Sequence, residues 1–213
     1  MTIKAIFLDA ANTLVHKPEL YPSMQRVLHA HGIDVDLDYL ARQHRFMSEA
    51  KVFPDRTSRE FYLEFNSELL RSLGVLPDLK LLDELFSACS YLRWKAFPDV
   101  ASLASIKLPL GVLSNWNTRL PETLSLIPDL RFAWVLGSEQ LGLRKPDPAF
   151  YERILSATKL KGQEIVYIGD SMRLDIEPAL KLGFRAALID RDNLYMHSNV
   201  PRLTTLSQVS TLL

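Results

Sequence analysis

Short apolar runs alternate with helix-length segments through the second half of the chain, and this alternation constrains the fold more than any other feature. The runs are Leu110–Leu113, Phe132–Leu136, Ile165–Ile168 and Ala186–Ile189. Strands separated by helices pair in parallel, and their helices cover both faces of the sheet. With a further run at Ile3–Leu8, the pattern predicts an α/β fold: a doubly wound, Rossmann-like core with a five-stranded parallel sheet.

Between the first and second predicted strands lies a long segment with helical spacing and no strand pattern. Helices are predicted over residues 22–30 and 37–50, after the capping-box sequence at 57–60, and after residue 78. Because these helices interrupt the α/β pattern, we expect an all-helical insert at residues 16–94. The α/β core then comprises residues 1–15 and 95–213.

The charge composition argues against several classes of partner. Lys plus Arg and Asp plus Glu both number 25, and no run of basic residues marks a surface for nucleic acid or an anionic membrane. No apolar run reaches the roughly 18 residues of a membrane span. The single cysteine, Cys89, makes no internal disulfide and is expected in the core of the insert. We therefore expect a cytoplasmic protein, and its oligomeric state has no signature in the sequence.

Polar residues suited to phosphate and metal chemistry follow four of the five predicted strands. They are Asp9 and Thr13 after the first, Ser114 and Asn115 after the second, Lys145 after the third, and Asp170 and Asp175 after the fourth. Each has an ordinary explanation, because an aspartate or serine can form a turn or cap a helix and a lysine can simply be solvated. Ligands in open α/β sheets, however, bind beyond the carboxyl ends of the strands, where all of these residues would meet.

The joint occurrence of these residues favours one shared site. Clustered carboxylates raise each other's pKa unless a cation lies between them. Mg²⁺ prefers carboxylate oxygens together with phosphate and water. A hydroxyl and a lysine complement the outer oxygens of a phosphoryl group. The residues therefore predict a Mg²⁺ site beside a place for a phosphoryl group.

The order of these motifs resembles that of the haloacid dehalogenase-like hydrolase superfamily, in its type with a helical cap between the first and second motifs. The resemblance implies that Asp9 is the nucleophile, which forms a covalent aspartyl intermediate, and that Ser114 and Lys145 complete the catalytic set. It implies phosphate contacts from Thr13, Ser114, Asn115 and Lys145. It assigns the metal to Asp9, Asp170, Asp175 and the backbone carbonyl of Ala11.

Ala11 departs from the pattern of the superfamily's phosphatases, which usually have a second aspartate there as general acid and base. Such catalysis contributes roughly 10²–10⁴ in rate. Three explanations are open: the leaving group needs no proton, another residue supplies the proton, or turnover is slow. Asn12 stands where glycine is common, and asparagine is the residue that next best tolerates a positive φ at such a position.

These explanations lead to different functions. The prediction we favour is a Mg²⁺-dependent phosphatase that acts on small phosphorylated metabolites. The superfamily's 2-haloacid dehalogenases also lack the second aspartate, but they need no metal and lack the leading aspartate of the fourth motif that Asp170 provides. A phosphonoacetaldehyde hydrolase would use Lys51 of the insert as a Schiff-base amine. A phosphate-binding module with little turnover is the non-enzymatic alternative.

Overall fold

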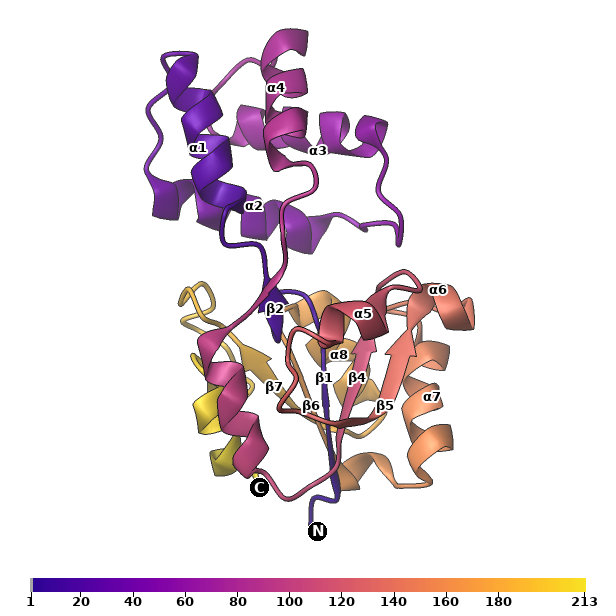
Figure 1. Cartoon of the computed structure of the whole chain (residues 1–213). Helices are drawn as coiled ribbons and strands as arrows, with labels where there is room; N and C mark the ends of the chain where they lie inside the picture. Colours follow the sequence, from indigo (N-terminus) through magenta and orange to yellow (C-terminus); the bar gives the residue numbers. More distant parts are fainter. Residues whose placement is uncertain (1) are drawn as a thin grey trace. The chain divides into compact units, whose positions relative to one another are not determined.

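The computed structural model describes residues 2–213, which separate into two units (Figure 1). One unit comprises the residues up to His16 together with Ala96–Leu213, and the other is Lys17–Lys95. Each boundary lies one residue beyond the predicted one. The short strands β2 (Val15–His16) and β3 (Lys95–Ala96) form a separate two-stranded sheet.

A six-stranded parallel sheet forms the centre of the first unit, in the order β5-β4-β1-β6-β7-β8. Its strands are β1 (Ala5–Leu8), β4 (Leu110–Ser114), β5 (Phe132–Gly137), β6 (Ile165–Gly169), β7 (Arg185–Ile189) and β8 (Arg202–Leu203). The predicted α/β fold is confirmed, but the prediction of five strands is wrong by one. The sixth strand, β8, has two residues, which are too few to produce an alternating pattern in the sequence.

The central position of β1 determines where a site can form. All four residues of β1 are buried, and the strand pairs with β4 on one side and β6 on the other. Residues that follow these three strands therefore meet at one edge of the sheet. The helices that connect the strands are α5 (Leu120–Leu124), α6 (Ser138–Leu141), α7 (Pro148–Thr158) and α8 (Glu177–Lys181).

Aromatic side chains fill much of the core around this sheet. Phe7, Phe150, Tyr151 and Tyr167 are fully buried within it. The rings of Tyr151 on α7 and Tyr167 on β6 lie 5.5 Å apart. These two tyrosines bring polar hydroxyl groups into an otherwise apolar core, where each hydroxyl needs a partner.

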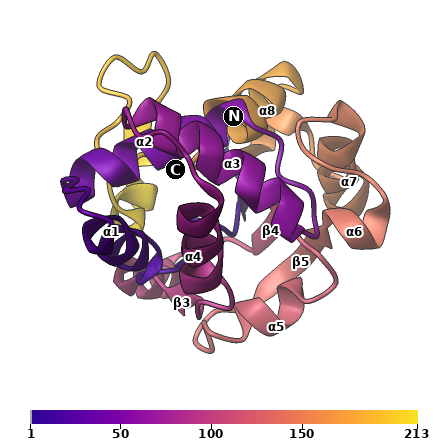
Figure 2. The ribbon, with the colours of Figure 1, turned by 90° about the horizontal axis from the view of Figure 1, so that it is seen from above.

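The second unit consists of the helices α1 (Leu20–Ala30), α2 (Leu37–Ala50), α3 (Arg59–Ser72) and α4 (Leu79–Cys89) (Figure 2). Asp36, Ser58 and Asp78 are the N-caps of the last three, and each accepts a hydrogen bond from a backbone N–H. The apolar faces of the helices enclose a core of their own. Cys89 packs against this core and is partly buried, and burial raises the pKa of its thiol to about 11. Among residues 2–213, none of the helices has both the length and the apolar character that a membrane crossing needs.

Candidate active site

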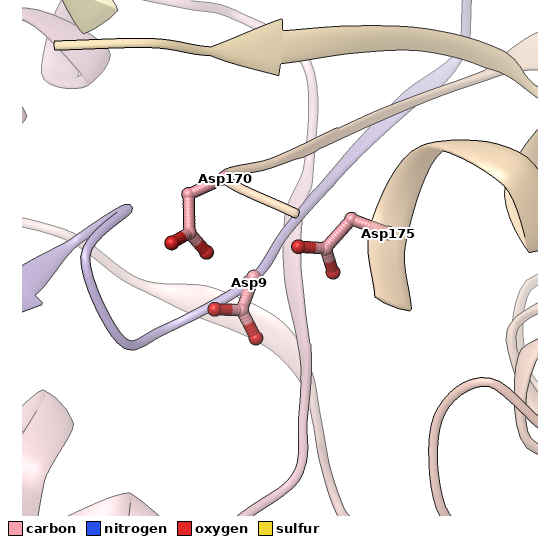
Figure 3. Close-up of side chains that lie close together, drawn as sticks. All are labelled: Asp9, Asp170 and Asp175. Atoms are coloured by element: carbon pink, nitrogen blue, oxygen red, sulfur yellow. The ribbon is translucent and has the colours of Figure 1, made fainter. Parts of the chain in front are cut away.

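Three aspartates meet at the carboxyl edge of the six-stranded sheet, and their carboxylates lie close together (Figure 3). Asp9 follows β1 and Asp170 follows β6, and the backbone N of Asp9 donates to the carbonyl of Ile168 at 2.9 Å. Asp175 reaches them from a one-turn helix at Met172–Ile176. One carboxylate oxygen from each aspartate lies within 4.8 Å of the other two, so the cluster could hold a metal ion.

Gly169 leaves the space that Asp175 occupies. A Cβ atom built on Gly169 would lie 2.5 Å or less from the Cβ, Cγ and Oδ2 atoms of Asp175. The backbone N of Ser171 donates to Oδ2 of Asp175 at 3.0 Å, and the Ser171 hydroxyl caps the turn by accepting from Leu174 N at 2.8 Å. The Gly-Asp-Ser sequence therefore turns the chain so that Asp170 and Asp175 both reach the cluster.

Lys145 bridges two of the aspartates. The residue is 2% exposed, and its ammonium group donates to Oδ1 of Asp9 and to Oδ1 of Asp175, the latter at 2.6 Å. The Asn115 amide binds the main chain of Lys145: its Oδ1 accepts from Lys145 N at 2.7 Å, and its Nδ2 donates to Lys145 O at 3.1 Å. Asn115 therefore positions the lysine from the end of β4. The phosphate contact expected of Asn115 stays a prediction.

The two hydroxyls expected to bind phosphate have different surroundings. Ser114 donates through Oγ to Oδ1 of Asp9 at 2.9 Å, and it orients the carboxylate expected to be the nucleophile. Thr13 is fully buried, and its Oγ1 has no hydrogen-bond partner within residues 2–213. A buried hydroxyl without a partner costs about 1–3 kcal/mol of folding free energy. Thr13 is therefore suited to donate a hydrogen bond to a ligand oxygen. Phosphate binding by both hydroxyls stays a prediction.

A tight loop joins β1 to β2 and contains the position where the second aspartate is missing. The carbonyl of Ala10 accepts from the backbone N of Val15 at 3.0 Å, and Ala11 forms an isolated bridge with Val15. Asn12 has a φ of 55°, which confirms the expectation that asparagine serves here in place of glycine. Ala11 is half-buried, and the metal-binding role of its carbonyl stays a prediction.

Burial and like charge perturb the titration of the site. Burial raises the pKa of Asp9 to about 7, and the negative charges of Asp175 and Asp170 add to this rise, whereas Lys145 opposes it. Burial favours the neutral form of Lys145, but Asp175 and Asp9 raise the pKa of its ammonium group well above the usual range. With all groups ionised, three carboxylates and one ammonium leave two negative charges, which one divalent cation would neutralise.

The donor set fits Mg²⁺. All three members of the cluster are oxygen donors, and Mg²⁺ is a hard cation that binds carboxylate oxygens and completes its shell with water and phosphate oxygens. The space left by Gly169 lets the Asp175 carboxylate reach the cluster without a clash. Asp9, Asp170 and Asp175 are therefore the side chains that would hold the ion.

Sequence reasoning missed two residues that contact the predicted set. The hydroxyl of Tyr167, within β6, lies 3.2 Å from Oδ1 of Asp175. Arg191, which follows β7, donates to the carbonyl of Thr13 at 2.9 Å and to Asp99 at 2.6 Å. The only signal for Tyr167 in the sequence is a polar hydroxyl inside the apolar run of β6. The sequence contains no signal for Arg191.

Lys51, considered above as a Schiff-base amine, is bound to Glu64 in the helical unit. Its Nζ donates to Oε1 of Glu64 at 2.7 Å. This hydrogen bond and the charges of Glu64 and Glu68 raise the pKa of Lys51. A Schiff-base lysine needs a lowered pKa, so the surroundings of Lys51 argue against a phosphonoacetaldehyde hydrolase.

Comparison with known proteins finds relatives along most of the chain. A family model for hydrolases, described as haloacid dehalogenase-like hydrolase, matches residues 3–183. A glyceraldehyde 3-phosphate phosphatase of Methanocaldococcus jannaschii is 45% identical over 190 residues, which cover 85% of this chain and 82% of the relative. Haloacid dehalogenase-like hydrolase domain-containing protein 3 of Danio rerio is 30% identical over 129 residues, which cover 57% of this chain and 53% of the relative. The matched segment thus spans about half the length of that relative.

A solved structure shares the fold of both units. The HAD-hydrolase YfnB of Bacillus subtilis, crystallised with magnesium, aligns over 100% of this chain and 99% of its own with a TM-score of 0.66. Its sequence identity to this chain is 16%, so the likeness concerns the fold alone.

Proposed function

Because the chain belongs to the haloacid dehalogenase-like hydrolases, we propose that it is a Mg²⁺-dependent phosphatase acting on small phosphorylated metabolites. The observation that carries this proposal is the cluster of Asp9, Asp170 and Asp175 together with Lys145 at the carboxyl edge of the sheet. Mg²⁺, when bound there, supplies positive charge to the phosphoryl oxygens. A positive site fixed in a buried setting stabilises the charge that develops during phosphoryl transfer.

Asp9 is the nucleophile in this proposal. Ser114 and Lys145 both donate to its Oδ1, which leaves Oδ2 to attack phosphorus. A bond forms between Oδ2 and phosphorus, the bond from phosphorus to the leaving oxygen breaks, and that oxygen takes up a proton. Water then attacks the phosphorus of the aspartyl phosphate and the bond between phosphorus and Oδ2 breaks, which restores the Asp9 carboxylate and releases inorganic phosphate that carries the protons of the water. Lys145 offsets negative charge on Asp9 throughout.

The alanine at position 11 determines which leaving groups this chain handles best. With no aspartate there, the leaving oxygen obtains its proton from water or from another group. An aryl oxygen needs less protonation than an alkyl oxygen, because it is a weaker base. We therefore expect a larger preference for aryl over alkyl phosphates than a second aspartate would give.

A phosphorylated three-carbon aldehyde is the first metabolite to test. The relative from Methanocaldococcus jannaschii that carries the name glyceraldehyde 3-phosphate phosphatase shares 45% identity across most of both chains. Because of this identity, we propose that this chain acts on a substrate of similar size and charge. A cytoplasmic location is part of the same proposal.

Phosphate release from an aryl phosphate and from glyceraldehyde 3-phosphate tests the proposal. We expect release to require Mg²⁺, to stop with EDTA, and to be lost in Asp9→Asn. Activity that is unaffected by EDTA or by Asp9→Asn would refute the mechanism. Halide release from a 2-haloacid without metal would indicate a dehalogenase instead. Stabilisation by Mg²⁺ and a phosphate analogue with no hydrolysis of either substrate would indicate a binding module.

A further inference from the structure

A buried tyrosine hydroxyl contacts one carboxylate of the aspartate cluster. Tyr167 is fully buried on β6, and its hydroxyl oxygen is 3.2 Å from Oδ1 of Asp175 and 3.1 Å from the backbone carbonyl of Leu113. Both neighbours are hydrogen-bond acceptors, and a phenol has one proton to donate. Hydrogen bonds to an ionised acceptor are roughly twice as strong as those to a neutral one. The Tyr167 hydroxyl therefore donates its proton mainly to Asp175 Oδ1.

The other contacts of Asp175 make this hydroxyl important. Oδ1 also accepts from Lys145 at 2.6 Å, and Oδ2 accepts from the backbone N of Ser171 at 3.0 Å. Lys145 is shared, because it also donates to Asp9. In the proposed reaction the Lys145 ammonium group also contacts the phosphoryl group. We therefore expect its hydrogen bond to Asp175 to weaken when substrate binds. Tyr167 and the Ser171 amide then hold the two carboxylate oxygens in place.

We propose that Tyr167 is a positioning residue, whose hydroxyl fixes the orientation in which Asp175 binds the divalent cation. This inference rests on the proposed function, since it concerns the same metal site. Partners that orient a metal ligand typically change metal affinity by about 10–100-fold when they are removed. Tyr167 does not contact the position of phosphorus attack in this proposal, so its loss should alter metal binding far more than the chemical step.

Tyr151 offers a matched control. It is equally buried, its ring lies 5.5 Å from that of Tyr167, and its hydroxyl donates to the backbone carbonyl of Leu174. Replacing either tyrosine by phenylalanine removes one buried hydroxyl and keeps the ring. Only Tyr167→Phe removes a hydrogen bond to a carboxylate of the cluster, so a difference between the variants separates metal positioning from general loss of core stability.

The experiment titrates Mg²⁺ into metal-free full-length protein by calorimetry and follows the shift in Tm with Mg²⁺. We expect Tyr167→Phe to raise the Kd for Mg²⁺ about tenfold or more, and Tyr151→Phe to leave it within about twofold of wild type. At saturating Mg²⁺, kcat for an aryl phosphate should stay within about threefold of wild type in both variants, so that the defect appears in metal affinity. A wild-type Kd in Tyr167→Phe, or an equal rise in both variants, would overturn the inference.

Two outcomes separate this inference from the proposed function. If wild-type protein shows no Mg²⁺ binding, the metal site of the proposed function is wrong and the role of Tyr167 falls with it. If wild type binds Mg²⁺ and hydrolyses phosphate while Tyr167→Phe behaves like wild type, only the positioning role is wrong. Should Tyr167→Phe fail to fold, carbon-13-labelled tyrosine in the wild-type protein replaces it. Mg²⁺ should then shift the Tyr167 resonance more than that of Tyr151, and an unchanged Tyr167 resonance would overturn the inference.

Discussion

Replacing Gly169 by alanine should disable the metal site by moving a single carboxylate. The added Cβ would lie 2.5 Å or less from three atoms of Asp175, whereas ordinary contacts begin at 3.4 Å. The Asp175 side chain must therefore move by about 1 Å, because the fixed strand β6 offers little room for the backbone to yield. Such a shift strains its hydrogen bonds to Lys145 at 2.6 Å and to Ser171 N at 3.0 Å.

The energetic consequences divide between stability and metal binding. Overpacking of this kind costs about 1–3 kcal/mol of unfolding free energy. Mg²⁺ tolerates little departure from its octahedral geometry, and a misplacement of about 1 Å at an active site can cost roughly 10²-fold in rate. We therefore expect Gly169→Ala to weaken Mg²⁺ binding by about tenfold to a hundredfold and to lower kcat/KM by a similar factor.

Gly111→Ala is the matched control for this change. Its Cβ would lie 2.7 Å or less from three ring atoms of Phe7, so it also overpacks the sheet, but against an aromatic ring on β1. Calorimetric titration of Mg²⁺ and urea unfolding of both variants give the two quantities required. Both variants should lose stability, and only Gly169→Ala should lose Mg²⁺ affinity. Wild-type affinity in a folded Gly169→Ala protein would refute the argument that this glycine admits the Asp175 carboxylate.

Three further predictions concern other parts of the chain. Ala11→Asp should speed alkyl phosphate hydrolysis by about tenfold or more; an unchanged rate in steady-state assays, with Mg²⁺ binding intact, would mean that protonation of the leaving group is not limiting. Burial, assisted by the charge of Arg45, lowers the pKa of His44 to about 3, so the folded state excludes a proton that the unfolded chain binds below about pH 6.5. The free energy of unfolding should thus be highest above pH 6.5 and should fall by about 1–2 kcal/mol near pH 5. The same pH dependence of urea unfolding in wild type and in His44→Gln would contradict this. Arg191→Ala should destabilise the protein by about 1–3 kcal/mol because it removes the charged donor of the half-buried Asp99, which keeps only the neutral donors Thr205 Oγ1 and Leu206 N; a urea midpoint equal to that of wild type would contradict this.

The sequence predicts the parts of this fold that repeat over several residues. The apolar runs at residues 110–113 and 165–168 are long enough to register as strands, and both appear in the structure as β4 and β6. Arg202–Leu203 is too short to register, and it joins the sheet only because β7 presents an open edge to it. Length therefore separates the strands that could be predicted, which have four to six residues, from the two-residue strands β2, β3 and β8, which could not.

The candidate site also has residues that the sequence could predict and contacts that it could not. The sequence could place three aspartates together, because parallel strands end at one edge of the sheet. Asp9 and Asp170 directly follow strands, and Asp175 lies in the helical turn after the second of these. The contacts of Tyr167 and Arg191 depend on where long side chains end after packing. No local pattern encodes such distances, so these contacts required the structure.

The pairing of β1 bears on how this chain is made. Its partners are residues 110–112 and 165–168, and the helical unit Lys17–Lys95 lies between β1 and both of these segments in the sequence. During synthesis β1 leaves the ribosome before both of its neighbours, and the helices α1 to α4 are all made before β4 follows. An apolar strand without its partners is a template for aggregation, so we expect Ala5–Leu8 to be the segment of the growing polypeptide most exposed to mispairing until β4 has emerged.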